Sequence, residues 1–172
     1  MIEDLEVERI LIPVDFSDSS RKAFYVGVKL ATKLNADAHI LHVEGPLHTM
    51  TDPVAVAEEV ERLEDGVRRR LNALYERGGL EEVDRRRVFV EIRGGKPWME
   101  ICRYAEEENI GLIVMVTEGL SGVKHAIKGS TAERVVNRAA CPVLTVKPDG
   151  YESNIDGITY SILVLDKHKH SR

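Results

Sequence analysis

The sequence lacks several features that define common classes of protein. It has only two cysteines, Cys102 and Cys141, and no Cys-x-x-Cys pair, so it offers no metal-site spacing and fits a reducing compartment. Its formal net charge of -5 disfavours a nucleic-acid or anionic-membrane partner, because phosphate attraction needs a positive surface. No run approaches the roughly 20 apolar residues of a membrane-spanning helix, and residues 1–6 are acidic where a signal peptide would be basic. We therefore expect a cytoplasmic protein that neither inserts into membranes nor binds nucleic acid.

The motifs of several enzyme classes are also missing. The sequence contains no Walker A loop, no His-Glu-x-x-His pair and no Gly-x-Ser-x-Gly elbow. A phosphorelay receiver would need an aspartate at the end of the third predicted strand, where the chain reads Glu91-Ile92-Arg93. A pyrophosphatase-type adenylating enzyme would need two glycines that the loop at residues 15–20 does not contain. His39 and His42 are three residues apart in a predicted strand, so they point to opposite faces and cannot share a metal. No set of residues predicts a fast enzyme.

What the chain does contain is a regular alternation of short apolar runs and helical patterns. The apolar runs predict strands at residues 9–14, 38–43, 88–92, 112–116 and 142–146. Helical spacing and helix-start residues predict helices at about 17–34, 52–77, 98–108 and 130–139. Such crossovers return each strand in the same direction, which predicts a doubly wound, five-stranded parallel sheet with helices on both faces. We expect a single α/β domain over residues 1–148, because a chain of 172 residues, 43% of them hydrophobic, can bury one core.

One edge of the predicted sheet collects the candidate functional residues. Ligands of such sheets bind beyond the carboxyl ends of the strands, where the strand order switches. Asp15 follows the first predicted strand, Val43 ends the second, and a glycine-bearing loop follows Val116 at the end of the fourth. That loop leads into a helix, whose first N–H groups and positive dipole end favour an anion. The pattern raises the hypothesis that this loop holds a phosphate.

Four stretches together resemble the universal stress protein family of nucleotide-binding α/β domains. They are residues 10–17 (ILIPVDFS), 95–97 (GKP) with Ile101, 112–115 (LIVM), and 129–135 (GSTAERV) with 141–146 (CPVLTV). The resemblance covers roughly residues 8 to 147. It implies an adenine-nucleotide alpha-hydrolase-like fold, ATP or a related nucleotide held with Mg²⁺, very slow hydrolysis at most, and a homodimer, often formed through the fifth strand.

The phosphate motif of the family is only partly present. In nucleotide-binding members the fourth strand is followed by Gly-x-x-Gly, nine residues, and Gly-Ser or Gly-Thr. Gly119, Gly129 and Ser130 match this spacing, but Val116 replaces the first glycine and Glu118 brings a negative charge. Valine is stiff where glycine would let the backbone approach a phosphate. The resemblance places Asp15 near the ribose and adenine, and the other residues around the base or the phosphates. The implied nucleotide-binding residues are Pro13, Val14, Asp15, Val43, Met115, Val116, Gly119, Gly129, Ser130 and Thr131.

Two functions therefore stay open at this point. The first is a stress-response regulatory module that binds a nucleotide at a partly degenerate site, supported by Asp15, Gly119, Gly129 and Ser130. The second is a family member that has lost nucleotide binding and acts as a dimeric interaction protein, favoured by Val116 and Glu118.

The chain continues beyond the family pattern. Residues 149–172 form a C-terminal extension in which 158–165 (ITYSILVL) is apolar and β-prone. An unpaired strand of this kind would be an aggregation hazard, so we expect it to pair with a sheet edge of its own or a partner subunit. The closing residues 167–170 (KHKH) are expected to be a solvated end and no metal site.

Overall fold

The fold alternates strands and helices in the order that the sequence predicts. A computed structural model describes residues 7–45, 53–78, 80, 83–116 and 131–147. The strands are β1 (Arg9–Pro13), β2 (Asp37–Glu44), β3 (Val88–Gly94), β4 (Leu112–Val116) and β5 (Val143–Val146). The helices are α1 (Asp18–Leu34), α2 (Pro53–Arg77), α3 (Pro97–Glu107) and α4 (Thr131–Arg138), with a short 3-10 helix, η1, at Arg85–Arg87. The predicted α/β class, five strands and four helices are confirmed, whereas the predicted strand 158–165 lies outside the described residues.

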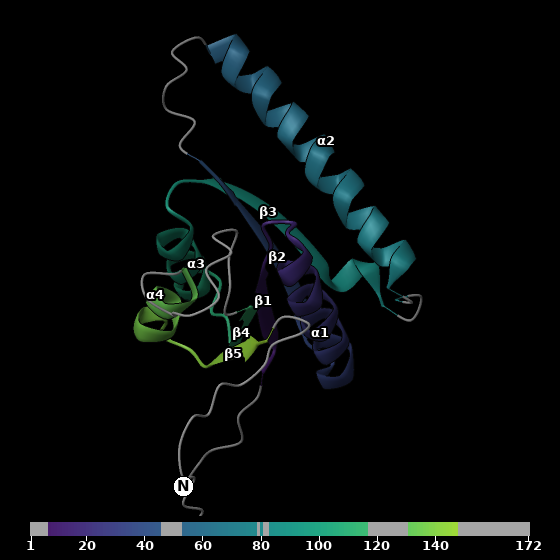
Figure 1. The fold of residues 1–172 in the computed structure, drawn as a ribbon, viewed down its shortest axis with the longest axis vertical. Helices are drawn as coiled ribbons and strands as arrows, with labels where there is room; N and C mark the ends of the chain where they lie inside the picture. Colours follow the sequence, from purple (N-terminus) through teal and green to yellow (C-terminus); the bar gives the residue numbers. More distant parts are fainter. Residues whose placement is uncertain (1–6, 46–52, 79, 81–82, 117–130, 148–172) are drawn as a thin grey trace, which may run out of the picture.

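All neighbouring strands run parallel, in the order β3-β2-β1-β4-β5 (Figure 1). The chain builds outward from β1 through β2 to β3, and then returns to the other side of β1 for β4 and β5. The strand order therefore switches between β1 and β4, which is the position where sheets of this kind leave a crevice at their carboxyl edge.

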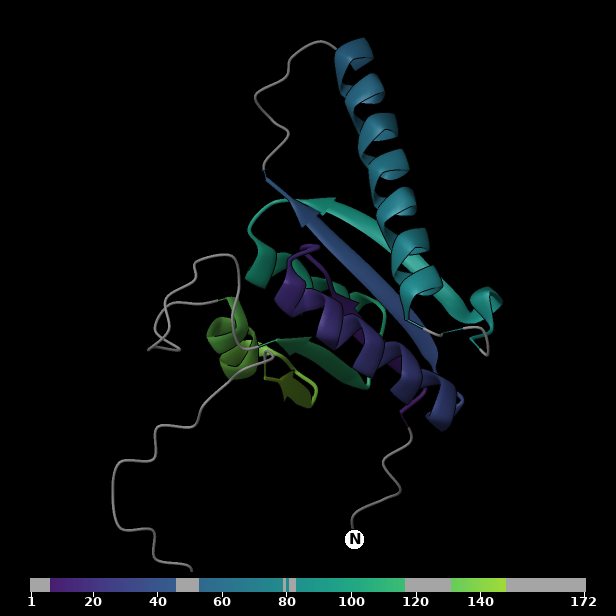
Figure 2. The same cartoon turned by 45° about the vertical axis from the view of Figure 1, so that its right-hand side comes forward.

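Helices cover both faces of the sheet and create two separate hydrophobic layers. Helices α1 and α2 lie on one face and α3 and α4 on the other (Figures 1 and 2). Ile10 and Ile12 of β1 point into the α1/α2 layer, whereas Leu11 points into the α3/α4 layer. This alternation, with period two, explains why the central strands are apolar at every position: both of their faces are buried.

Helix α1 begins and ends at the residues that the sequence indicates. The Ser17 side chain accepts a hydrogen bond from the Ser20 backbone N–H and so caps the first turn. Asn35 ends the helix in the left-handed conformation, with φ of 54°, and its backbone N–H reaches back to the last carbonyls. Inside the helix, Gly27 lies directly against Ile12 of β1, where a side chain would have no room. These features fix α1 over the end of β1.

Helix α2 is buried over only part of its length. Val67, Leu71 and Leu74 in its second half recur at helical spacing, so they share one apolar face, and they pack into the core. In its first half, Val60 of the same face is 38% exposed. Figures 1 and 2 show the first turns of α2 projecting beyond the sheet. The apolar face of α2 is therefore longer than the core that covers it.

Candidate functional site

The carboxyl ends of β1 and β2 bring the first predicted site residues to one rim. Pro13 pairs in register with Leu41, and the Val14 backbone N–H donates to the Leu41 carbonyl at 2.9 Å. Asp15 follows immediately, and Val43 lies two residues beyond Leu41 on the neighbouring strand. Because parallel strands end at the same edge, Asp15 and Val43 lie at the same level of the rim.

Asp15 is held in a tight turn at the entrance to α1. Its carboxylate Oδ1 accepts hydrogen bonds from the Ser17 backbone N–H at 3.0 Å and from the Ser17 hydroxyl at 2.6 Å. The residue as a whole is exposed, although its carboxyl turns toward the helix start. Burial there raises the pKa of the carboxyl, but the hydrogen bonds from Ser17 and Ser20 outweigh burial and hold the pKa below its usual value. Asp15 is therefore a fixed, ionised hydrogen-bond acceptor at the open edge of the sheet.

Two further residues, which the sequence did not single out for this site, shape the same turn. Phe16 adopts a left-handed conformation with φ of 61°, uncommon for a residue other than glycine, asparagine or aspartate. Its ring lies 5.1 Å from the ring of His42. The Nδ1 of His42 donates to the Val14 carbonyl at 2.8 Å, because a carbonyl can only accept. The only sign of this in the sequence was a histidine, His42, within an apolar-rich strand. Its structural role is to hold the end of β1 through the Val14 carbonyl.

The two histidines of β2 do point to opposite faces, as predicted. His39 contacts Tyr104 of α3, whereas His42 contacts Val14 and Phe16 on the other face. Across the part of the chain that the structure describes, no group of three or more His, Cys, Asp or Glu side chains could hold a metal ion.

The predicted base-pocket residues divide between the two faces of the sheet. Val43 packs against the α3/α4 layer and Met115 belongs to it, and the alternation of β1 places Pro13 on that face with Leu11. Val14 instead belongs to the α1/α2 layer and is only 4% exposed. The Val14 side chain is therefore part of the core, so only its backbone is available at the rim.

Val116, which replaces the first glycine of the family motif, is buried and ends β4 in register with Val146. Val114, two residues earlier, and Val146 both pack on the α1/α2 layer. Alternation along the strand therefore places the Val116 side chain on that layer, opposite Met115. The sequence could reveal the valine, but it could not reveal the face into which its side chain points.

The phosphate end of the predicted site is described only at Thr131, the first residue of α4. Ala132 and Val135 of that helix are buried in the α3/α4 layer, so Thr131 begins a helix on the same face of the sheet as Met115. Gly119, Gly129 and Ser130, together with Glu118, lie outside the described residues.

Comparisons with known proteins agree with this architecture and settle the family. The sequence model of the "Universal stress protein family" matches residues 6–147. The chain belongs to the universal stress protein family. Universal stress protein YxiE of Bacillus subtilis is 31% identical over 148 residues, which cover 81% of this chain and 98% of that protein.

Solved structures of universal stress proteins share the fold. UspA from Lactobacillus plantarum superposes with a TM-score of 0.63 at 26% identity, covering 82% of this chain and 98% of that chain. A universal stress protein in complex with cAMP superposes with a TM-score of 0.60 at 21% identity, covering 81% and 95%. At that identity the second likeness shows the fold alone. Among the helices of the described residues, this universal stress protein has none whose length and apolar character would let it span a bilayer.

Proposed function

We propose that this universal stress protein binds an adenine nucleotide at the carboxyl edge of the sheet and acts as a cytoplasmic regulatory module. The observation that carries the proposal is the Asp15 carboxylate, which is held by Ser17 at the point where the strand order switches. An ionised, exposed carboxylate at that position would accept hydrogen bonds from the hydroxyls of a ribose. Pro13 and Val43, both partly exposed, would offer an apolar surface to the base from one face of the sheet, with Met115, only 6% exposed, behind them in the same layer.

The residues present fit a nucleotide at its nucleoside end. Val116 opposes binding less than its β-branched side chain suggests, because alternation directs that side chain toward α1 and away from Met115. At the other end, Gly129, Ser130 and Thr131 would hold the phosphates of ATP with backbone N–H groups, and Mg²⁺ would neutralise part of their charge. We propose binding with slow or no hydrolysis, so that occupancy of the site is itself the signal.

A second function, that of an interaction protein without a nucleotide, is favoured by one specific observation. The edge strand β3 exposes Phe89 and Val90, at 47% and 45%, and an open edge with exposed apolar side chains is a surface that native proteins usually cover. Glu118, in the predicted phosphate loop, also disfavours an anion. In this alternative, the dimer and the apolar edge would carry the function.

Titration calorimetry with ATP and Mg²⁺ would test the proposal. We expect the native protein to bind, and Asp15→Asn to weaken binding by about tenfold or more, because a hydrogen bond to a charged acceptor contributes about 1.5–3 kcal/mol. Asp65→Asn is the matched control, since Asp65 is an exposed carboxylate on α2, away from the rim. Titration with cAMP in parallel would show whether the triphosphate is needed.

Two variants at Val116 would separate the functions. Val116→Gly restores the family motif and Val116→Ala removes bulk without restoring glycine's backbone freedom. Binding by the native protein that neither variant improves would support the proposed function. Native protein that fails to bind, with binding restored by Val116→Gly, would make the interaction protein the better conclusion. Absence of binding in all three proteins would overturn the nucleotide proposal.

A further inference from the structure

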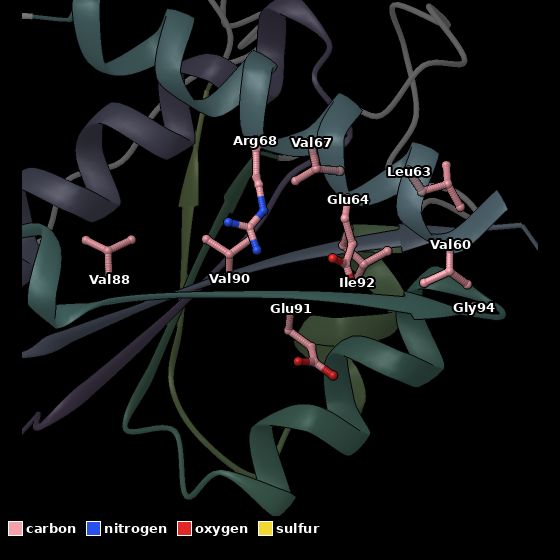
Figure 3. A pocket seen from close by; sticks show the side chains of 10 residues that line it. All are labelled: Val60, Leu63, Glu64, Val67, Arg68, Val88, Val90, Glu91, Ile92 and Gly94. Atoms are coloured by element: carbon pink, nitrogen blue, oxygen red, sulfur yellow. The ribbon is translucent and has the colours of Figure 1, made fainter. Parts of the chain in front are cut away.

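An apolar groove of about 500 Å³ separates helix α2 from the edge strand β3. Val60, Leu63 and Val67 of α2 form one wall, and Val88, Val90 and Ile92 of β3 form the other (Figure 3). Figure 3 shows these two sets of side chains directed toward each other, with Glu91 on the opposite side of the strand. The groove lies on the α1/α2 face of the sheet, whereas Val43 and Met115 of the candidate nucleotide site face the α3/α4 layer, so the two sites are separate.

The groove continues along an open sheet edge. Within the described residues, β3 pairs only with β2, so its outer side presents backbone N–H and C=O groups without a strand partner. An open edge that also exposes apolar side chains such as Phe89 and Val90 is a hazard that native proteins cover. The projecting half of α2 extends over the same region, and Val60 and Leu63 lie above the end of β3 near Gly94 (Figure 3). Helix α2 and strand β3 therefore leave room for one more strand at the outer edge of β3.

We propose that residues 158–165 of the C-terminal extension add to β3 as a sixth strand beneath α2. In an extended conformation, alternate residues share a face. Ile158, Tyr160, Ile162 and Val164 would then form an unbroken apolar face, while the opposite face begins with Thr159 and Ser161. The apolar face complements the valines and leucine of α2. The eight residues of this segment also match the seven residues of β3 in length.

The chain is long enough to make this connection within one molecule. β5 ends at the carboxyl edge of the sheet, and a strand added outside β3 would lie five strand positions away, or roughly 24 Å at about 4.8 Å per strand. The eleven residues 147–157 can span up to about 36 Å when extended. A segment that arrives at the carboxyl edge would run antiparallel to β3, which is the more stable of the two pairings.

Two charged side chains of α2 also line the groove and are compatible with this occupant. Glu64 and Arg68 extend from α2 toward β3 in Figure 3, and both residues are exposed. Long side chains of this kind cover an apolar surface with their stems while their charged ends stay in water. An incoming strand would displace these stems toward solvent without burying either charge.

Hydrogen–deuterium exchange of the β3 amides would test the proposal. The full chain would be compared with a chain that ends at Lys147. We expect the amides of residues 88–94 to exchange at least about tenfold faster in the shortened chain, because an edge strand without its partner opens more readily. Val90→Lys and Ile162→Lys should produce the same increase in the full chain. The matched controls are Val136→Lys, at a valine of similar exposure on α4, and Ser161→Lys, on the other face of the proposed strand; neither should produce it.

Three results would overturn the proposal. The first is equal exchange of residues 88–94 in the full and shortened chains. The second is a loss of protection on shortening that falls on β5 and not on β3, which would place the extension at the other edge. The third is protection of β3 that disappears on dilution, which would show that the strand comes from a second copy. Unchanged exchange elsewhere in the shortened chain would confirm that it still folds.

Discussion

At the scale of single residues, His39 gives a testable pH dependence of stability, because folding lowers its pKa. Its Nδ1 lies 2.8 Å from the Tyr104 hydroxyl, its ring stacks on Phe89 at 5.0 Å, and the residue is only 5% exposed. Burial lowers the pKa of His39, because the charged imidazolium loses its hydration. Burial also raises the pKa of Tyr104 to about 12, so its hydroxyl stays protonated in this contact.

His39 should make the protein less stable in mild acid. Because its pKa is lower in the folded state, the unfolded state binds more protons as pH falls below about 6.5, the ordinary histidine value. The stabilising contribution is therefore full above that pH and is lost as pH falls toward the folded-state pKa. Urea unfolding at neutral pH and at about pH 5 should show a smaller loss of unfolding free energy in His39→Gln than in the native protein.

Tyr104→Phe is the control for this pH dependence. It removes the hydroxyl partner but keeps the titrating ring, so it should lower the unfolding free energy by about 1 kcal/mol at both pH values. An equal acid-induced loss in the native protein and in His39→Gln would contradict the assignment. Asp15 does not contribute to the acid-induced loss between neutral pH and pH 5. Its pKa is lowered, so its stabilising contribution is lost only as pH falls below its ordinary value of 3.8.

At the scale of elements, two helical glycines give opposite predictions. A Cβ added to Gly27 of α1 would lie 2.6 Å from two side-chain atoms of Ile12, a residue that is fully buried in the α1/α2 layer. A Cβ added to Gly66 of α2 would meet nothing within 4 Å. The first glycine is required by close packing of helix on strand, whereas the second only weakens its helix.

Alanine at these two positions should therefore change stability in opposite directions. Gly27→Ala should lower the unfolding free energy by about 1–3 kcal/mol, because overpacking exceeds the gain in helix propensity. Gly66→Ala should raise it by about 0.5–1 kcal/mol through propensity alone. Urea midpoints measured at one pH check both values. A stabilised Gly27→Ala protein would show that α1 can move away from β1 without cost.

The elements also show what the sequence could and could not predict. Apolar runs and helical patterns were enough for the five described strands and for helices α1 to α4, because each pattern reflects a surface that must be buried. The short helix η1, which buries no residue, was not predicted. The sequence also located Asp15 correctly, since a residue after an apolar run lies at the sheet edge. It could not show that the Val14 and Val116 side chains point away from the candidate base pocket, or that His42 secures the turn. Those facts depend on contacts between strands that are distant in sequence.

At the scale of the whole molecule, the two edges of the sheet offer different surfaces. The β3 edge has an open groove under α2, which we assign to the chain's own extension. At the other edge, β5 is four residues long and Leu144 is 40% exposed. No helix of the described residues extends past this edge as α2 does past β3. A short edge strand with an exposed leucine suits the two-fold contact of a homodimer, in which the same surface meets itself.

A single charge at β5 should therefore change the oligomeric state. We predict that the native protein sediments as a dimer and that Leu144→Lys shifts it to the monomer, because the two-fold contact would bring two lysines together in a desolvated interface. Leu34→Lys, at a similarly exposed leucine at the end of α1, should leave the dimer intact. The chain ending at Lys147 should also remain dimeric, since its extension would belong to the β3 edge. A dimer that survives Leu144→Lys but dissociates on removal of the extension would assign dimerisation to the extension and contradict both edge assignments.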